Sequence, residues 1–204
     1  MLRTAMENEP KVDLCFSIRG KTVPVDHGFD LYSCISRILP LFHEAQDVGL
    51  KLIRGRYTGD GLLSLQPNSW LVFRLYSSGL SPYINLAGNN LDLRGHLIQI
   101  GVPKTRAVNP SSTLYSHLVT TRNGQEQERF LTEINRQLSE MGVKAEVHLG
   151  DRKTFTVHDK KVVGYSMQLL GLLDEDSIKV QERGLGGRRK MGCGFFESID
   201  NDEQ

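Results

Sequence analysis

Cysteine is scarce in this sequence, which has only Cys15, Cys34 and Cys193 among its 204 residues. Because their number is odd and no two of them have a CxxC spacing, we expect neither a disulfide framework nor a structural zinc site. Free thiols are typical of the reducing cytoplasm, and a cytoplasmic protein is therefore predicted.

Long apolar runs are also missing. No stretch of about 18 apolar residues occurs, so neither a membrane-spanning helix nor a membrane partner is expected. The first ten residues, MLRTAMENEP, lack the apolar core of a signal peptide. With 39% hydrophobic and 24% charged residues, the chain has the composition of a globular protein of one large domain or two small ones.

A strong excess of one charge is absent from the chain as a whole, whose formal net charge is +1. The charges are unevenly distributed, however. Residues 1–10 carry one Arg and two Glu, and residues 197–204 carry four acidic residues and no basic one. Between these ends, 24 basic residues stand against 18 acidic ones. A positive body with acidic ends is compatible with RNA binding but does not establish it.

Glycine, in contrast, is concentrated in residues 180–196, VQERGLGGRRKMGCGFF. Glycine lets backbone N–H groups approach a ligand, and arginine and lysine bind phosphate, so this loop suits a polyanion. It is neither a Walker loop, because no Lys-Ser or Lys-Thr follows the glycines, nor a dinucleotide fingerprint, because Arg189 replaces the third glycine. A flexible, solvated hairpin is equally compatible with the pattern.

Hydrophobic periodicity in the first half predicts the order strand, helix, two strands, helix, strand, which is one ferredoxin-like βαββαβ unit. The first helix carries an apolar stripe at Leu31, Ile35, Ile38, Phe42 and Ala45. Pro40 should kink this helix or restart it. The predicted elements are residues 12–18 with 21–25, 30–45, 51–57, 62–65, 70–75, 80–87 and 91–100.

The pattern then begins again. The predicted elements of the second half are strands at 101–108 and 114–120, a helix at 126–141, strands at 146–149, 155–158 and 162–173, a helix at 174–180 and a strand at 192–199. We therefore predict an α+β protein of two tandem ferredoxin-like units, residues 1–100 and 101–204, with a C-terminal glycine-rich loop.

Tandem ferredoxin-like units that end in a glycine loop and a last strand resemble the CRISPR-associated repeat-cleaving endoribonucleases, the Cas-six family. Three segments are similar to the MYXAN-type branch of this family: VPVDHGFDLYSCISRILPLFHEA, LKLIRG and GVPKTRAVNPSSTLYSHLV. The resemblance covers residues 12–196.

This resemblance implies metal-independent cleavage, without a cofactor, of the repeat in a long CRISPR transcript. The 2′-hydroxyl attacks the scissile phosphate and leaves a 2′,3′-cyclic phosphate and a 5′-hydroxyl. The implied partners are CRISPR repeat RNA and other subunits of a surveillance complex, in which the protein stays on the 3′ hairpin of the guide RNA. Relatives of the MYXAN type also occur beside CRISPR-linked transposons, so the resemblance does not decide which system the chain serves.

The family places a catalytic histidine on or next to the first helix, and the resemblance therefore points to His43 and His27. Histidine can act as general acid or base near neutral pH. We rank His43 first, because a tyrosine often occupies the His27 position in relatives. Lys51 could stabilise the charge that develops on the phosphorane. His43-Glu44 does not begin an HExxH motif, since Asp47 stands at its second histidine position, and no metal site is predicted.

The predicted RNA-binding residues lie in three elements. The glycine loop is expected to hold backbone phosphates near the first unit's active site, Lys-x-Arg at 104–106 matches a family segment, and a basic hairpin could lie against an A-form groove. These residues are Arg183, Arg188, Arg189 and Lys190 in the loop, Lys104 and Arg106 in the second unit's first strand, and Arg152, Lys153, Lys160 and Lys161 in the hairpin. A charged, solvated turn explains the hairpin as well.

Two other functions are left open by these residues. A non-catalytic subunit that holds the guide RNA hairpin would keep the same loop and cations, and only the effect of His43→Ala on cleavage would distinguish it. An RRM-like reader of single strands would need aromatic RNP motifs, to which residues 194–196, GFF, are the nearest and a weak approach.

Overall fold

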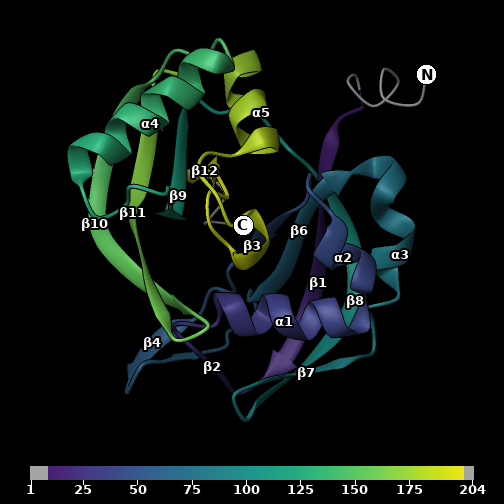
Figure 1. Cartoon of the computed structure of the whole chain (residues 1–204). Coiled ribbons are helices and arrows are strands. Elements are labelled where there is room, and N and C mark those ends of the chain that lie inside the picture. The colour runs from purple at the N-terminus through teal and green to yellow at the C-terminus, as the bar shows by residue number, and fades with distance from the viewer. Residues whose placement is uncertain (1–8, 200–204) are drawn as a thin grey trace. The chain divides into compact units, whose positions relative to one another are not determined.

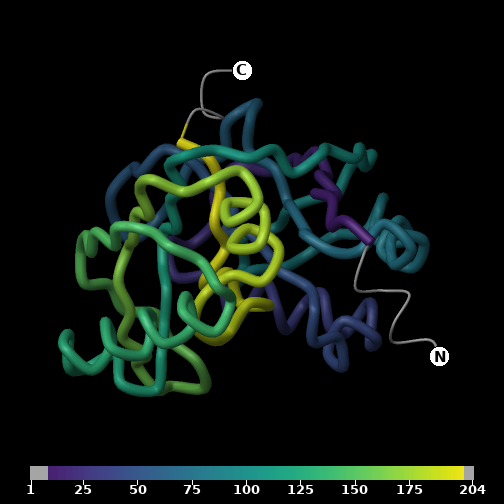
Figure 2. Tube along the Cα trace, turned by 90° about the horizontal axis from the view of Figure 1, so that it is seen from above, coloured from purple at the N-terminus to yellow at the C-terminus, as the bar shows by residue number. Residues whose placement is uncertain are grey.

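The computed structural model describes residues 9–199 and divides the chain into two compact units, Met1–Val108 and Asn109–Gln204. Each half of the chain folds back on itself, the first from purple to teal and the second from green to yellow in Figures 1 and 2. No helix of the described residues is long and apolar enough to cross a membrane. All three cysteines are free and buried.

The first unit is built on a five-stranded antiparallel sheet of order β3-β6-β1-β8-β7. Its strands are β1 (Lys11–Gly20), β3 (Gly49–Lys51), β6 (Trp70–Tyr76), β7 (Asn90–Leu93) and β8 (His96–Ala107). The order β8-β1-β6-β3 is that of one ferredoxin-like unit, and β7 extends its edge. A small sheet of order β2-β5-β4 is formed by β2 (Thr22–Pro24), β5 (Leu62–Ser64) and β4 (Arg56–Gly59).

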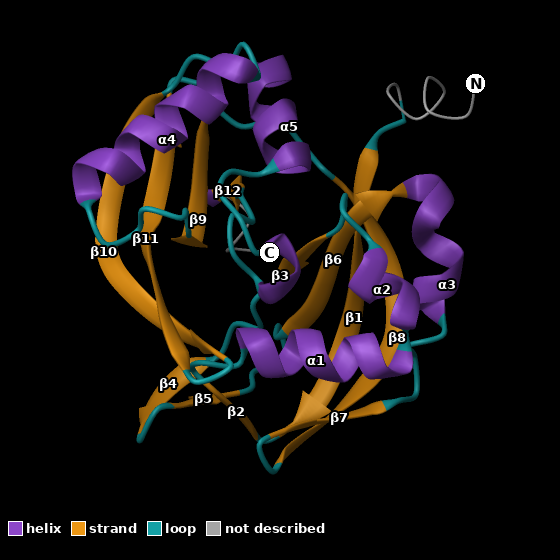
Figure 3. Cartoon of the chain, in the orientation of Figure 1, coloured by secondary structure: helices purple, strands orange, loops and turns teal. Residues whose placement is uncertain are grey.

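The helices of the first unit cover one face of the larger sheet (Figure 3). They are α1 (Gly28–Ile38), α2 (Pro40–Glu44) and α3 (Leu80–Ile84), the last preceded by a 3-10 turn at Ser77–Gly79. The predicted break is confirmed, because α1 ends before Leu39 and Pro40 occupies the first turn of α2. Alternate residues of the strands, such as Leu14, Phe16 and Phe73, form the core beneath these helices.

The opposite face of this sheet contains a buried ion-pair network. Asp13 accepts two hydrogen bonds from Arg74, at 2.7 Å from Nε and 3.0 Å from Nη2, and one of 3.0 Å from Arg106. The Asp13 and Arg74 side chains are each 2% exposed. Such a pair is compensated inside the sheet, and removal of either partner would leave a buried charge alone.

The position of the unit boundary differs from the prediction. The predicted strand 101–108 is the second half of β8, which pairs with β1 from Ile98↔Gly20 to Ala107↔Val12. Lys104 and Arg106 therefore belong to the first unit, and not to the first strand of the second. The strand is long because β1 offers it a continuous partner, which no local pattern in the sequence reveals.

The second unit is a four-stranded antiparallel sheet of order β10-β11-β9-β12, with two helices on one face (Figure 3). Its elements are β9 (Thr113–Val119), α4 (Gln127–Glu140), β10 (Glu146–Val157), β11 (Lys160–Leu170), α5 (Asp174–Arg183) and β12 (Glu197–Ser198). This is again the ferredoxin-like order. Phe130, Ile134 and Leu138 of α4 pack on Met167 and Leu169 of β11.

Two predicted elements of this unit are merged or shortened. The strands expected at 146–149 and 155–158 are one strand, β10, which accommodates one extra residue between Leu149 and Arg152 as a bulge. The last strand, expected at 192–199, is reduced to two residues, because residues 184–196 form a folded loop instead. This loop includes a 3-10 turn at Arg189–Met191.

Candidate catalytic residues and anion-binding loop

His43 lies on α2 and is held at the surface by its neighbour in the chain. Phe42 is fully buried and packs edge-on against Phe73, with 5.6 Å between the ring centroids, which anchors α2 to the core. The His43 side chain is 63% exposed. A histidine on a fixed element but open to solvent can exchange protons with a ligand.

Tyr32 of α1 orients the His43 ring. Its hydroxyl lies 2.6 Å from His43 Nδ1, and the two ring centroids are 6.0 Å apart. A phenol hydroxyl can donate or accept, so it can hold Nδ1 with or without a proton on that nitrogen. The other ring nitrogen, Nε2, lies 4.0 Å from Glu44 Oε1 and is the atom that this arrangement presents for proton transfer.

Tyr32 was not predicted as a site residue from the sequence. In one continuous helix Tyr32 and His43 would be about three turns and about 16 Å apart, so contact would not be expected. The break before Pro40 brings α2 back against α1 and makes the contact possible. Same-face spacing across a helix-breaking proline is the signal that could have identified this pair.

His27 lies in a different environment, and the structure corrects its predicted role. Its side chain is 1% exposed, its Nε2 accepts a 3.0 Å hydrogen bond from the Ile53 N–H, and its Nδ1 lies 2.7 Å from the Pro24 carbonyl oxygen. Nδ1 must therefore carry the proton and donate it to Pro24. Burial lowers the pKa of His27. With both nitrogens engaged inside the unit, His27 is a structural residue at the start of α1.

Lys51 groups with the two predicted RNA-binding cations of β8. Strand pairing aligns Lys104, Cys15, Val72 and Lys51 in one row across four strands, so these side chains share one sheet face. Burial, and then the charge of Asp13, raises the pKa of the Cys15 thiol. The charges of Arg106, Lys104 and Lys51 act in the opposite direction and lower it. The structure thus brings Lys51 to the face opposite the helices, whereas His43 lies on α2 on the helical side.

The other two cations of this face already have contacts within the unit. Lys104 Nζ lies 4.5 Å from the centroid of the Trp70 ring, which places the ammonium over an aromatic surface. Arg106 is 43% exposed and is bound to Asp13 through Nη2. Both side chains are therefore held in position on an exposed stretch of β8.

The glycine loop is an ordered part of the second unit rather than a solvated hairpin. The N–H groups of Gly187 and Gly194 donate to the carbonyl oxygens of Thr120 and Leu118, at 2.8 Å and 2.7 Å. Leu185 and Phe196 are fully buried in the core under the helices. The loop is therefore attached to the end of β9 by hydrogen bonds and apolar contacts.

Glycine is required in this loop where the backbone passes close to other segments. At Gly186, φ is +75° and a Cβ would lie 2.3 Å from the Thr120 carbonyl oxygen. At Gly194, φ is +65° and a Cβ would lie 2.0 Å from the Leu185 carbonyl oxygen. Glycine thus permits the close packing of the loop, in addition to any approach by a ligand.

The four loop cations differ in how they are held. Arg183 and Arg188 are exposed, and Arg188 has the left-handed backbone conformation, with φ of 58°. Arg189 and Lys190 are half-buried, and Arg189 Nη2 donates to the Glu182 carbonyl oxygen at 3.4 Å. Arg183 and Arg188 are therefore the better placed of the four to meet a ligand.

The hairpin cations lie along β10 and β11. Arg152 donates to Gln125 Oε1 at 3.0 Å, and Lys153 Nζ lies 3.1 Å from His117 Nδ1. Burial lowers the pKa of Lys153. Lys160 and Lys161 are exposed at the start of β11. The hairpin is thus structured at its base, where Arg152 and Lys153 have partners.

No cluster of three or more His, Cys, Asp or Glu side chains that could hold a metal ion occurs within residues 9–199. Each unit carries candidate residues of its own: the Tyr32–His43 pair and the cationic sheet face lie in the first unit, and the glycine loop lies in the second.

Comparison with known proteins relates the chain to one family. The sequence model of the family described as Cas6 Crispr matches residues 12–201. The CRISPR-associated endonuclease Cas6 of Myxococcus xanthus (strain DK1622) is 36% identical over 185 residues, which cover 91% of this chain and 80% of that protein.

Solved structures agree in fold. A CRISPR associated protein Cas6 has a TM-score of 0.66 at 10% identity and covers 93% of this chain and 99% of its own. A RAMP protein described as binding different RNA substrates also has a TM-score of 0.66, at 14% identity, over 92% of this chain and 99% of its own. The predicted α+β architecture of tandem ferredoxin-like units is confirmed.

Proposed function

The chain belongs to the Cas6 family of CRISPR-associated proteins, and from this premise we propose that it is an endoribonuclease that binds CRISPR repeat stem-loops and cuts the precursor transcript into guide RNAs. The observation that carries the proposal is the Tyr32–His43 pair, an exposed imidazole held by a 2.6 Å hydrogen bond on a helix anchored in the core. A proton-transfer group of this kind is what metal-free RNA cleavage requires.

The reaction is a transesterification. The 2′-hydroxyl oxygen forms a bond to the scissile phosphorus as its proton leaves to a base, and the bond from phosphorus to the 5′-oxygen breaks as that oxygen takes a proton. The products carry a 2′,3′-cyclic phosphate and a 5′-hydroxyl. His43 Nε2 performs one of the two proton transfers, and Tyr32 is a positioning residue that acts through Nδ1.

Only one of the two predicted histidines can act in this way, because His27 is buried. Alignment of the 2′-oxygen with the leaving 5′-oxygen therefore supplies a large share of the rate in our proposal, and such positioning can be worth about 7 kcal/mol or more. Lys51, predicted to stabilise the phosphorane, lies on the sheet face opposite the helices, so we propose that it binds an RNA phosphate there and does not act on the phosphorane beside His43.

Direct RNA binding is proposed for six of the predicted cations, all of which are exposed. These are Arg183 and Arg188 in the glycine loop, Lys104 and Arg106 in β8, and Lys160 with Lys161 at the hairpin. Arg189, Lys190, Arg152 and Lys153 are proposed to support these contacts, since part of each side chain is engaged or buried within the second unit. The protein is proposed to remain on its product and to meet other subunits of a surveillance complex there.

The test is cleavage of the repeat RNA from the protein's own array in excess EDTA, under single-turnover conditions. Wild type should cut once and leave a 2′,3′-cyclic phosphate. His43→Ala should lose about 10²–10⁴-fold in rate, and Tyr32→Phe about tenfold, both with unchanged RNA affinity. His148→Ala is the matched control, because His148 is an exposed histidine already bound to Glu146 at 2.6 Å.

Three results would contradict parts of this proposal. Cleavage that stops in EDTA would refute the metal-free mechanism. Equal rates for His43→Ala and His148→Ala would remove His43 from catalysis. Tight, specific binding with no cut by any variant would leave a non-catalytic subunit that holds the guide RNA hairpin.

A further inference from the structure

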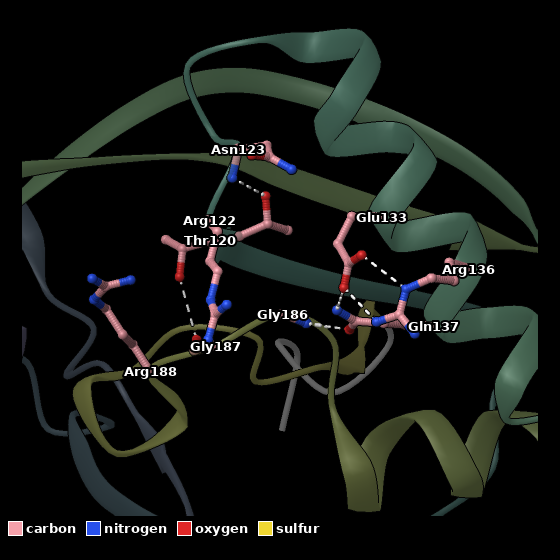
Figure 4. A pocket seen from close by; sticks show the side chains of 10 residues that line it. Thr120, Arg122, Asn123, Glu133, Arg136, Gln137, Gly186, Gly187 and Arg188 are labelled. Carbon is pink, nitrogen blue, oxygen red and sulfur yellow. Dashed lines mark hydrogen bonds and ion pairs between the residues drawn. The ribbon is translucent and has the colours of Figure 1, made fainter.

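A pocket of about 560 Å³ opens within the second unit, between three segments that are far apart in the sequence (Figure 4). One wall is the chain after β9, residues 120–123. The second is the face of α4 that carries Glu133, Arg136 and Gln137, and the third is the glycine loop at residues 186–188. Pockets of this size accommodate one small ligand or one nucleotide.

The α4 wall is electrically balanced. Glu133 accepts a 2.7 Å hydrogen bond from Arg136, which is also bound to Glu140. Hydrogen bonds from Arg136 and then Gln137 lower the pKa of Glu133 to about 2, and those to Glu133 raise the pKa of Arg136. Both groups stay charged and compensate each other, so this wall contributes shape more than charge.

Gln137 joins this wall to the glycine loop. Its amide donates to Glu133 Oε1 at 2.6 Å, and its carbonyl oxygen accepts a 2.8 Å hydrogen bond from the Gly186 N–H. On the other side of the loop, the Thr120 hydroxyl donates to the Gly187 carbonyl oxygen at 3.3 Å. The pocket walls are therefore tied together before any ligand arrives, which reduces the entropic cost of binding.

Arg122 and Arg188 carry the remaining positive charge of the pocket. Within residues 9–199 neither guanidinium forms an ion pair or a hydrogen bond with a carboxylate. The charge of Arg122 contributes to the lowered pKa of Glu133. Both residues are exposed and line the same pocket. Figure 4 shows both side chains on the side of the pocket away from Arg136.

The backbone at Arg188 supports a functional role for its side chain. A left-handed conformation is costly for a residue with a Cβ, typically by about 1–3 kcal/mol, and persists where the surroundings demand it. Its neighbour Gly187 leaves open space, since a Cβ there would meet nothing within 4 Å. The loop thus leaves the space beside Gly187 unfilled and holds Arg188 in a conformation that is uncommon for a residue with a Cβ.

We propose that this pocket binds a backbone phosphate of an unpaired RNA nucleotide, with Arg122 and Arg188 as its ligands. Guanidinium groups match phosphate oxygens in pairs, and the Thr121 hydroxyl and Asn123 amide lining the same pocket add donors. A concave site admits a nucleotide that can leave the stack, whereas duplex phosphates are met on open surfaces. This inference rests on the proposed function and adds Arg122, which the sequence did not point to.

The experiment measures equilibrium binding over a range of salt concentrations, in a His43→Ala background. Two RNAs are compared: the repeat stem-loop with its unpaired flanks, and the same stem-loop trimmed to its paired part. Arg122→Ala and Arg188→Ala should each weaken binding of the flanked RNA about tenfold and reduce its salt slope by about 0.7, with no effect on the trimmed RNA. Gly187→Leu, which fills the open space, should weaken the same RNA while the charge is kept.

Arg129→Ala is the matched control, because Arg129 is an exposed arginine of α4 that is paired with Glu126 outside the pocket. If Arg122→Ala and Arg188→Ala bind the flanked RNA like Arg129→Ala while wild type still cleaves, the pocket assignment alone is wrong. An equal loss on the trimmed RNA would also overturn it. If about 1 mM AMP displaced the flanked RNA from the protein but no longer did so in Arg122→Ala, the pocket would instead be assigned to free nucleotides. A wild type that neither binds nor cleaves the repeat would overturn the proposed function and the pocket's ligand together.

Discussion

At the level of single residues, burial distinguishes two histidines that lie close to each other in the sequence and were both predicted to be catalytic. Both were assigned to the region of the first helix, and imidazole chemistry suits either for proton transfer. His43 is 63% exposed, and its Nδ1 lies 2.6 Å from the Tyr32 hydroxyl. His27 is 1% exposed and has both nitrogens bound to backbone groups. The same side chain is thus a candidate acid or base in one place and a link between loops in the other.

Replacement of His27 should affect stability and its pH dependence. Burial lowers the pKa of His27 in the folded protein below its ordinary value of 6.5, whereas the unfolded chain takes up the proton near 6.5. The contribution of neutral His27 to the free energy of unfolding is therefore complete above a pH of about 7. It is lost as the pH falls from about 6.5 toward the pKa of His27 in the folded protein. His27→Ala leaves the Ile53 N–H without its acceptor, which should cost about 1–3 kcal/mol at pH 7.5.

Urea unfolding at pH 7.5 and pH 5.5 measures both effects. The difference in unfolding free energy between wild type and His27→Ala should shrink at the lower pH. The control is His96→Ala, at a histidine that is bound to Thr22 by one ring nitrogen at 2.8 Å. Parallel pH dependence of wild type and His27→Ala would contradict the assignment of a buried, neutral histidine.

Neighbouring glycines of the loop should differ in their tolerance of a methyl group. Gly186→Ala places a Cβ 2.3 Å from the Thr120 carbonyl oxygen at a φ of +75°, and should destabilise the protein by about 2 kcal/mol or more. Gly187→Ala meets nothing within 4 Å and has no left-handed φ, so its effect should stay within about 0.5 kcal/mol. Thermal unfolding of the two variants makes the comparison, and equal melting temperatures would show that the loop adjusts without cost.

At the scale of elements, the sequence was most informative where the hydrophobic pattern is local. The apolar stripe and Pro40 predicted α1, the break and α2, because helix periodicity and a missing N–H act within a few residues. The end of β8 was missed because it depends on pairing with β1, nearly a hundred positions earlier in the chain. The Tyr32–His43 contact was missed for a similar reason, since it depends on the angle between two helices.

The glycine loop was identified from composition, but its anchor on α4 was not. Gln137 is one of several polar residues on that helix, and only the fold brings its amide to the Gly186 N–H at 2.8 Å. Gln137→Leu keeps the volume of the side chain and removes both hydrogen bonds. We expect faster amide hydrogen exchange in residues 184–194 and repeat RNA affinity about fivefold weaker, because the loop would lose its preorganisation.

Asn135→Ala is the control for this change, as Asn135 is an exposed residue of the same helix that does not line the loop pocket. It should leave exchange in residues 184–194 unaltered. Unchanged exchange in Gln137→Leu would show that the hydrogen bonds to β9 alone hold the loop.

At the scale of the whole molecule, the candidate functions are divided between the two units. The first unit carries the Tyr32–His43 pair and Lys51, and the second carries the glycine loop, the basic hairpin and the Arg122 pocket. Each unit has a core of its own, with Phe16, Phe42 and Phe73 in one and Phe130 and Phe196 in the other. The proposed proton transfer thus rests on the core of the first unit, whereas the proposed RNA contacts rest on both cores, through the cations of β8 in the first unit and the glycine loop in the second.

This division predicts the behaviour of the second unit produced alone, as residues 109–204. It contains all four strands of its sheet, both helices that cover them and the hydrogen bonds that fix the glycine loop, so we expect it to unfold cooperatively in a thermal melt. It should bind repeat RNA about 10–100-fold more weakly than the full chain, because the cations of β8 are lost, and it should not cleave. The matched comparison is full-length His43→Ala, which lacks the same catalytic imidazole but keeps those cations. Cleavage by the fragment would place the catalytic group in the second unit, and a fragment without a cooperative melt would show that the two cores depend on each other.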